Sequence, residues 1–511
     1  MSAGIVLRRS VLVGLVLGGC VFAFAVEAVL PRRTRSAIEA PTDRSRRDPP
    51  PLGRARARLA RLSEIERRVL PPPLVPGPHR YATLPEYYGA ENPELLARFQ
   101  EAKAAFHRSP RPALHELTLV AGAAGVGKTF LKREVFSKAF PAGEICKLDL
   151  RELYDQWAAQ GITADKPDLA SGSLAINHLK TVVDKSRARI REHLEAHDAS
   201  FYVIDSLDEI HPDDYAWVLE QIEEFVRGDR RFVHAAVFGR GFAFREFWNG
   251  RRASRRTDDV ELYVLNPPAF RTLGDLCVSS WNYHVWRYKL KWAPDAKASA
   301  AMPLDAYAAW AKSGFARTGP FRSITCENND DMCAEVQDAL ADWAARSRVV
   351  CSMLYNLAGN SIVRDIVRRE TLLGHAYDER HVAEAYLDAW LARESRSHDR
   401  PSLEKPQYLD LYLMLLERTA VKYLKDGAVD DQGYFPVREG DAITVRYGGR
   451  DRTFPVRRIL DRSGLIVTNP CDPSPARYRF EPIWMHRLLV QMYGEPAVGH
   501  RPLASAALGA E

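Results

Sequence analysis

The chain has few cysteines, and no arrangement of them that would hold a metal. Its 511 residues include 7 Cys and 14 His, and these do not form a cluster of the type that zinc sites use. Cys326 and Cys333 are close together in the sequence, but a reducing compartment keeps such thiols free. Free cysteines are therefore expected, and a metal site built from cysteine and histidine is not.

Three further absences narrow the function. No Gly-x-Ser-x-Gly turn is present, so the nucleophile motif of many serine hydrolases is missing. No repeat with a period of about 20 to 50 residues is visible, so a leucine-rich-repeat or propeller domain is not expected in this chain. The guanine-recognising pattern Asn-Lys-x-Asp is also missing. If the chain binds a nucleotide, ATP is therefore expected rather than GTP.

The most specific motif present is a phosphate-binding loop. Gly122-Ala123-Ala124-Gly125-Val126-Gly127-Lys128-Thr129 fits G-x-x-x-x-G-K-[ST] and lies between an apolar run at 117–121 and a helical pattern at 130–140. Glycines let such a loop turn its N–H groups inward, at the positive end of the next helix, to surround phosphate oxygens. We expect Gly122 to Phe130 to bind nucleotide, with Lys128 on the β- and γ-phosphates and Thr129 on Mg²⁺.

Two later strands are expected to add charged groups to this site. The apolar run at 201–205 ends in Asp205. This pattern is typical of a buried parallel strand that places a carboxylate at its C-terminal end. Asp205 is expected to hold Mg²⁺ through water, and Asp208 or Glu209 to orient an attacking water. The strand at 232–238 runs into Arg240, which is expected to contact the γ-phosphate. Arg245 is the second candidate, and a solvated loop charge is the alternative for both arginines.

Together these motifs resemble the NACHT branch of the STAND P-loop NTPases. The resemblance rests on four apolar residues followed by Asp-x-x-Asp-Glu at 201–209, on the strand-end arginine, and on the second strand within 145–153. It covers about residues 110–425 and implies a parallel sheet with helices on both faces. It also implies an ATP or GTP switch that self-associates with triphosphate and is reset by hydrolysis. Segments 386–394 and 409–424 are similar to that family's helical lid, but Gly359-Asn360-Ser361 stands where many relatives carry Gly-x-Pro.

The C-terminal part changes to short strands. A hairpin about Gly448-Gly449 is followed by a helix at 457–463, strands at 465–467 and 478–480, and a helix at 483–493. This order resembles a winged-helix module, which in STAND proteins packs on the nucleotide core. Winged helices also bind DNA and five arginines lie at 446–458, but the packing role is favoured and nucleic acid is not an expected partner.

The N-terminus predicts a membrane anchor. The stretch 11–30 is apolar except for Glu27 and is long enough to cross a bilayer. A cleaved signal and a lipoprotein signal at Cys20 are the alternatives. Arginines after the stretch place the bulk of the chain in the cytoplasm by the positive-inside bias.

The basic charge of the chain is concentrated near this N-terminus. Residues 1–68 hold 14 Arg and 6 acids, a net charge of +8, and the remainder holds 58 basic and 60 acidic residues. Segment 31–68 therefore suits anionic lipid better than a nucleic-acid groove. Apolar positions at helical spacing within 59–69 indicate a helix on the membrane surface or against a partner helix, with a disordered linker as the alternative.

The predicted order is a transmembrane anchor (1–30), a basic Pro/Arg-rich linker (31–80), a P-loop core with a helical lead-in (81–270), a helical lid with an irregular insertion (271–425), a winged-helix-like domain (426–495) and a disordered tail (496–511). The expected function is a membrane-tethered, slowly ATP-hydrolysing signalling switch that forms homo-oligomers with triphosphate and acts on an unknown protein. The alternatives are a nucleotide-binding membrane scaffold without turnover, and a small-molecule kinase with Asp149 as its substrate acid.

Overall fold

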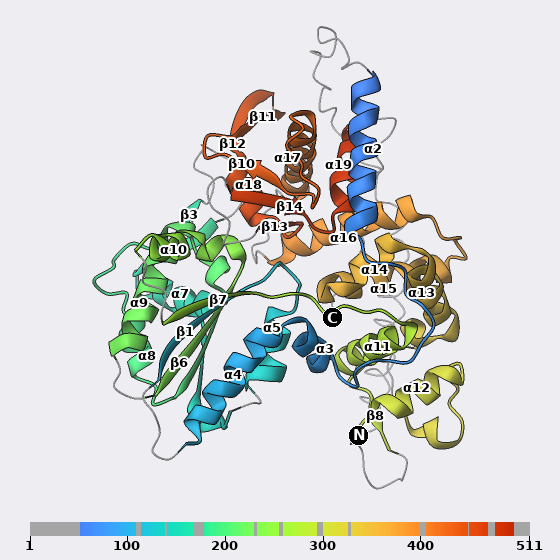
Figure 1. The fold of residues 1–511 in the computed structure, drawn as a ribbon, viewed down its shortest axis with the longest axis horizontal. Coiled ribbons are helices and arrows are strands. Elements are labelled where there is room, and N and C mark those ends of the chain that lie inside the picture. Colours follow the sequence, from blue (N-terminus) through green and yellow to red (C-terminus); the bar gives the residue numbers. More distant parts are fainter. Residues whose placement is uncertain are drawn as a thin grey trace, which may run out of the picture. The chain divides into compact units, whose positions relative to one another are not determined.

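Five parallel strands form the main sheet of this protein, whose computed structural model is shown in Figure 1. The structure describes residues 52–108, 114–137, 140–167, 178–228, 232–254, 259–293, 300–324, 329–397, 405–447, 449–468 and 476–494. The strand order is β2–β5–β6–β1–β7. The strands are β1 (His115–Ala121), β2 (Ile145–Asp149), β5 (Phe201–Asp205), β6 (Val233–Gly239) and β7 (Val260–Val264).

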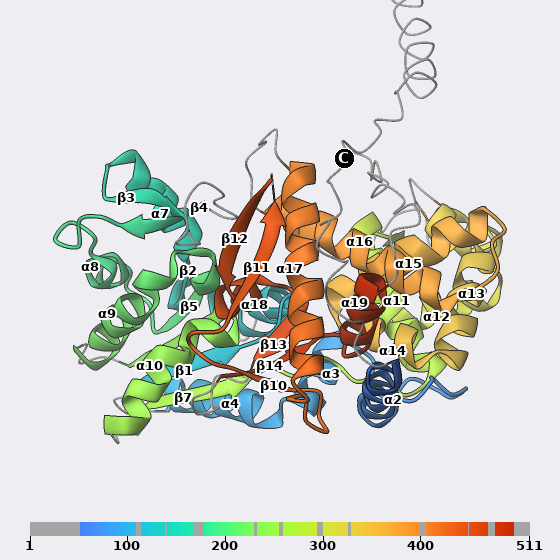
Figure 2. The same ribbon diagram turned by 90° about the horizontal axis from the view of Figure 1, so that it is seen from above.

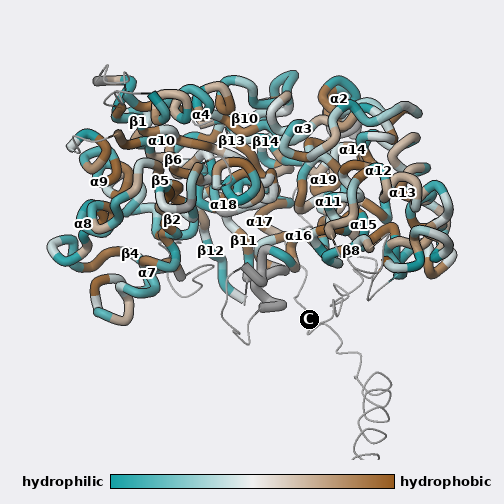
Figure 3. The backbone as a smooth tube through the Cα atoms, turned by 90° about the horizontal axis from the view of Figure 1, so that it is seen from below, coloured by the Kyte–Doolittle hydropathy of each residue, from teal (hydrophilic) through white to brown (hydrophobic). Residues whose placement is uncertain are grey.

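The sheet confirms the predicted parallel α/β core. Strands β5 and β6 are buried along their whole length, which explains why their sequences are mainly apolar. Figure 3 shows these strands as mainly brown, the colour of apolar residues. Ala121 lies opposite Gly239 and Asp149 opposite Asp205, so the C-terminal ends of the strands meet at one edge. The edge strand β7 and the antiparallel hairpin of β3 (Thr163–Pro167) and β4 (His178–Val182) were not predicted.

Helices cover both faces of the sheet, as the sequence predicted. On one face, alternate strand residues pack with α7 (Leu150–Ala159), α8 (Ile190–Glu195), α9 (Tyr215–Gly228) and α10 (Gly241–Ser254) in a single apolar cluster. The opposite face packs on α4 (Pro93–Phe106) and on the helix after the phosphate loop. There Phe99 contacts Phe136 with ring centroids 3.8 Å apart, and Phe106 meets Phe201 edge-on.

The described residues between 273 and 425 are mostly helical. Aromatic residues between 281 and 321 form a second small core around Tyr307 and Trp310, although Trp286 is 63% exposed. The helices are α11 (Leu273–Tyr288), α12 (Leu304–Lys312), α13 (Ala334–Arg346), α14 (Arg348–Tyr355), α15 (Leu357–Leu372), α16 (Glu379–Ser397) and α17 (Lys405–Lys425), with a two-residue pairing of β8 (Lys291–Trp292) and β9 (Ala300–Ala301).

The C-terminal module contains the elements that the sequence predicted, with one additional strand, β10. An antiparallel sheet β10–β14–β13 lies beside a separate pair, β11–β12. Helix α19 packs along α17, as Figure 2 shows. The elements are β10 (Phe435–Val437), β11 (Ala442–Tyr447), β12 (Arg450–Pro455), α18 (Val456–Arg462), β13 (Ile466–Thr468), β14 (Ala476–Phe480) and α19 (Trp484–Gly494).

The helix expected among the N-terminal arginines is α2 (Leu52–Val69), and it packs within the chain. Leu62 and Ile65 are each 2% exposed, and α2 contacts both α17 and α19. Glu66 accepts from Arg487 Nε of α19 at 2.9 and 3.0 Å. The apolar face that predicted a membrane-surface helix is therefore buried against the C-terminal helices.

The predicted membrane localisation must also be corrected. None of the helices within the described residues is sufficiently long and apolar to cross a membrane. Long helices such as α17 mix charged and apolar residues because one side packs on the chain. The stretch 11–30 and the tail 496–511 lie outside the described residues. The assignment as a single-pass membrane protein with a cytoplasmic body is therefore contradicted.

The packing of α19 on α17 predicts a pH dependence of stability. His486 is buried, and its Nε2 lies 2.9 Å from the carbonyl oxygen of Ala420. Burial lowers the pKa of His486 from 6.5 to about 4. The unfolded chain therefore binds more protons than the folded chain between these values, so stability is lost as pH falls through this window.

We expect His486→Gln, which keeps a donor for Ala420, to remove that loss. Between pH 7 and pH 5 the free energy of unfolding should fall by about 2 kcal/mol more in the wild type than in the variant. Urea unfolding at both pH values measures the difference, and other titrating groups cancel in the comparison. Equal losses in the two proteins would contradict the assignment of a neutral, buried imidazole.

Candidate nucleotide-binding site

The predicted loop lies at the edge where the parallel strands end. It leaves β1 at Ala121, and the Gly122 amide donates to the carbonyl of Gly239 at the end of β6, at 3.0 Å. The helix α5 (Lys128–Leu131) follows it, continued by a π-helical turn, η2 (Lys132–Phe136). Asp205 and Arg240 leave β5 and β6 at the same edge. Ligand sites of open parallel sheets form at this edge.

Glycines are required in the loop by backbone conformation and by close neighbours. Gly125 and Gly127 have φ of 73° and 104°, in the region that other residues rarely adopt. A Cβ at Gly127 would lie 2.0 Å from the hydroxyl of Tyr88. A Cβ at Gly125 would lie 2.4 Å from the Cβ of Ala358. Other parts of the chain therefore contact the loop directly.

Three loop carbonyls are bonded to residues outside the loop. Asn356 donates from Nδ2 to Ala124 at 2.8 Å, and the amide of Ala358 donates to Gly125 at 3.2 Å. The hydroxyl of Tyr88, on α3 (Leu84–Glu91), donates to the carbonyl of Val126. Bonds to these three carbonyls hold the loop in a conformation from which N–H groups can be presented to an anion.

Lys128 lies back against its own loop. Its Nζ donates to the carbonyls of Gly122 at 2.9 Å and Ala123 at 3.1 Å. Burial lowers the pKa of Lys128, and the nearby carboxylate of Asp208 opposes that effect. Thr129 is exposed on the first turn of α5, and the ring of Phe130 stacks on Tyr88 at 5.7 Å. Lys128, the predicted phosphate ligand, and Thr129, the predicted metal ligand, therefore both lie in the first turn of α5.

The acidic residues after β5 are paired with cations of the same chain. Asp205 is 8% exposed and forms an ion pair with Lys132. Ser206 has φ of 66°, which turns the chain sharply into η4 (Leu207–Glu209). Asp208 accepts from Arg240 through Nε at 3.0 Å and through the backbone amide at 3.1 Å. The predicted metal ligand and the predicted phosphate sensor thus both lie at the site, each neutralised by a partner.

Glu209 is the most accessible of these acids. Its side chain is 48% exposed, and Arg151 Nη1 lies 3.3 Å from its Oε2. Desolvation raises the pKa of Glu209, the charge of Asp208 raises it further, and Arg151 opposes both. A carboxylate with a raised pKa beside the loop suits the acceptance of a proton from water.

Two further candidates have structural roles instead. Arg245 is 4% exposed and donates to Tyr478 at 2.9 Å and Thr468 at 2.6 Å, so it joins α10 to the C-terminal module rather than contacting phosphate. Asp149 caps α7 by accepting from the amide of Arg151 at 3.0 Å and also accepts from Ser206 at 3.0 Å. These bonds occupy the carboxylate that the kinase alternative needed.

The expected lid turn at 359–361 is not a turn. These residues lie inside α15, where Asn360 is buried. The contact with the loop is made at the start of that helix, by Asn356 and Ala358. Asn356 is also the N-cap, accepting from the amides of Ala358 and Gly359. An asparagine directly before a periodic apolar run signals such a cap, but nothing local to it indicates the loop as its partner.

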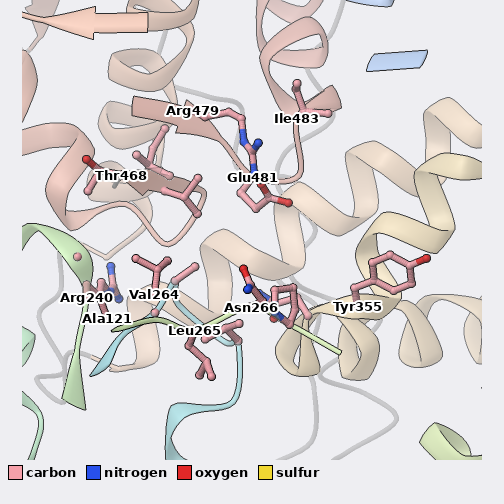
Figure 4. Close-up of a pocket in the computed structure, with 18 of the residues that line it drawn as sticks. Ala121, Arg240, Val264, Leu265, Asn266, Tyr355, Thr468, Arg479, Glu481 and Ile483 are labelled. Atoms are coloured by element: carbon pink, nitrogen blue, oxygen red, sulfur yellow. Dashed lines mark hydrogen bonds and ion pairs between the residues drawn. The ribbon is translucent and has the colours of Figure 1, made fainter. Parts of the chain in front are cut away.

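A cavity of about 440 Å³ lies next to the loop. Figure 4 shows Arg240 and Val264 on one side of it and Thr468, Arg479 and Glu481 on the other. Its volume lies within the range of small-molecule sites. Its walls come from the loop, the ends of β6 and β7, α14, the end of α2 and the C-terminal module: residues 69–71, 121–123, 126, 240–242, 264–267, 352, 355, 356, 434, 466–468, 479, 481 and 483.

The donor set fits magnesium nucleotide better than a metal alone. Within the part of the chain that the structure describes, no cluster of three or more His, Cys, Asp or Glu side chains could hold a metal ion. A magnesium ion at a phosphate loop needs one hydroxyl, a carboxylate reached through water, and nucleotide oxygens. Thr129 and Asp205 supply the two protein groups.

Comparisons with known proteins add little. No family model matches the sequence, and no curated protein sequence is similar to it. Several solved structures align over most of this chain, among them the following three. Cdc6p from Pyrobaculum aerophilum has 13% identity and a TM-score of 0.29, over 81% of this chain and 96% of that one. ORC2 of Aeropyrum pernix, in its ADP form, has 13% identity and a TM-score of 0.27, and the alignment covers 84% of this chain and 98% of that one.

The third structure is Drosophila ORC bound to DNA, with 13% identity and a TM-score of 0.24, over 77% of this chain and 94% of that one. At these values the function of the present chain has to follow from its own residues. The P-loop and the five-stranded parallel sheet are features of this structure itself.

Proposed function

We propose that this protein binds ATP with Mg²⁺ and hydrolyses it slowly, as a nucleotide-dependent switch of the STAND type. The observation that carries the proposal is the position of the loop. It lies at the C-terminal edge of a parallel sheet, beside Asp205, Glu209 and Arg240, and it borders a cavity of ligand size.

Each side chain has a distinct role in this proposal. Lys128 and the loop amides hold the β- and γ-phosphates, and Arg240 reaches the γ-phosphate after leaving Asp208. Thr129 and Asp205 hold magnesium, which supplies charge neutralisation for phosphoryl transfer. Glu209 orients the attacking water and accepts its proton.

The cavity walls support a switch rather than a metabolic enzyme. An occupant would contact the core at Arg240, the helix α14 at Tyr355, and the C-terminal module at Arg479. A ligand that touches all three favours the arrangement that holds them together, and its γ-phosphate alters the pairing of Arg240. Slow turnover is expected because Asp205, Asp208 and Glu209 are each paired with a cation of the same chain, which has to be displaced before the group can act.

The test is ATP binding, hydrolysis and particle mass for the purified full chain and Glu209→Gln. We expect ATP to be hydrolysed, and light scattering to show growth in mass with ATP but not with ADP, prolonged in the variant. A folded chain that binds no nucleotide at millimolar concentration would exclude the proposal. Binding without turnover, unchanged in Glu209→Gln, would favour the scaffold, and phosphate transfer to a small acceptor would favour the kinase.

A further inference from the structure

Lys132 forms an ion pair with the acid expected to hold magnesium. The ammonium group contacts Oδ2 of Asp205, and the two side chains are 20% and 11% exposed. An ion pair largely withdrawn from water is screened far less than a surface pair. Lys132 is not part of the phosphate-loop motif, which ends at Thr129.

The helix places Lys132 on the side where the metal is expected. Thr129 and Lys132 are three residues apart, and residues at this spacing share a helix face. At Lys132 the hydrogen bonding changes from α to π, and the amide of Ser137 donates to the Lys132 carbonyl five residues earlier. Single π-turns inside helices occur frequently at functional sites. Thr129 and Lys132 thus lie on one side of the same helix, and Lys132 contacts Asp205 from it.

We propose that Lys132 is an internal cation that competes with Mg²⁺ for Asp205. The proposal rests on the nucleotide function proposed above and adds a means of regulation to the same site. When magnesium is absent, Lys132 neutralises Asp205 and shields the phosphates from its charge, so ATP still binds. When magnesium binds, Lys132 has to leave the carboxylate. Lys132 therefore sets the magnesium concentration at which the ATP complex becomes metal-loaded.

The competition predicts two opposite effects of Lys132→Gln. Metal-free ATP should bind more weakly, since an unpaired carboxylate then lies near its phosphates. The magnesium concentration for half-saturation should fall, since no ammonium group has to be displaced. Each change is expected to be roughly three- to tenfold, the effect of one partly buried charge pair. A purely structural role for Lys132 would not move the two values in opposite directions.

The experiment is a titration of the full chain with N-methylanthraniloyl-ATP, in excess EDTA and over a range of MgCl₂ concentrations. Arg133→Gln is the matched control, because Arg133 is the adjacent cation, is 58% exposed and pairs with Glu134. It should behave as the wild type, and Lys132→Arg should largely restore wild-type magnesium dependence. Lys132→Met replaces the glutamine variant if the latter unfolds.

Equal magnesium dependence in the wild type, Lys132→Gln and Arg133→Gln would overturn the competition while leaving nucleotide binding intact. Equal shifts in Lys132→Gln and Arg133→Gln would overturn it too, since general charge loss would then be the cause. A folded wild type that binds the nucleotide analogue under neither condition would instead refute the proposed function on which the inference rests.

Discussion

Replacing Lys128 with alanine is expected to weaken ATP binding about 10- to 100-fold, the effect of losing one or two charge-assisted hydrogen bonds. The Lys128 ammonium group lies 2.9 and 3.1 Å from two loop carbonyls, at the mouth of the phosphate site. When the Lys128 ammonium group moves from these neutral carbonyl oxygens to charged phosphate oxygens, its hydrogen bonds become stronger. The variant loses that gain and also leaves the two carbonyls without their donor.

Equilibrium binding of a fluorescent ATP analogue measures this effect. Lys166→Ala is the control, since Lys166 is a 47% exposed lysine that pairs with Asp213 outside the loop. It should bind the analogue as the wild type does. If Lys128→Ala were to keep wild-type affinity and remain folded, the assignment of the loop to phosphate would be wrong.

Gly127→Ala is expected to lower the free energy of unfolding by about 3 kcal/mol, through backbone strain and overpacking together. The new Cβ would lie 2.0 Å from the Tyr88 hydroxyl and 2.9 Å from Cδ1 of Leu357. Tyr88 cannot move aside easily, because it is fully buried and stacked on Phe130. The φ of 104° adds its own strain to this clash.

Urea unfolding of two other glycine variants separates the two causes. Gly374 has φ of 68° with no neighbour within 4 Å of an added Cβ, so Gly374→Ala should cost about 1 kcal/mol from backbone strain alone. Gly143 has neither a positive φ nor a neighbour within that distance, and Gly143→Ala should be close to neutral. A similar cost at positions 127 and 374 would show that Tyr88 does not constrain the loop.

The sequence predicted the features whose cause is local. Four of the five sheet strands were located to within a few residues. Strands β1, β5 and β6 are mainly apolar because they are largely buried on both faces, whereas β2 carries the exposed Lys147 at its centre. The loop motif and the acids after β5 are also local patterns. They lie at one edge because all strands of the sheet are parallel.

Partnerships between distant residues could not be predicted in the same way. Arg245 and Arg240 are both arginines near the end of β6, and nothing local shows that Arg245 joins the C-terminal module. No sequence pattern predicts the contacts of Tyr88 and Asn356 with the loop either, since neither residue belongs to a motif. The apolar face of α2 indicated a membrane-surface helix because the helices that cover this face come more than 300 residues later in the chain.

The bonds to the loop carbonyls bear on how small a working fragment of this protein can be. A fragment spanning 114–270 would contain the whole motif and the whole sheet. It would lack Tyr88, Asn356 and Ala358, and the three carbonyls they bond would turn to water instead. The conformation of the loop thus depends on residues outside the sheet, and truncation at the limits of the sheet would keep the motif without its geometry.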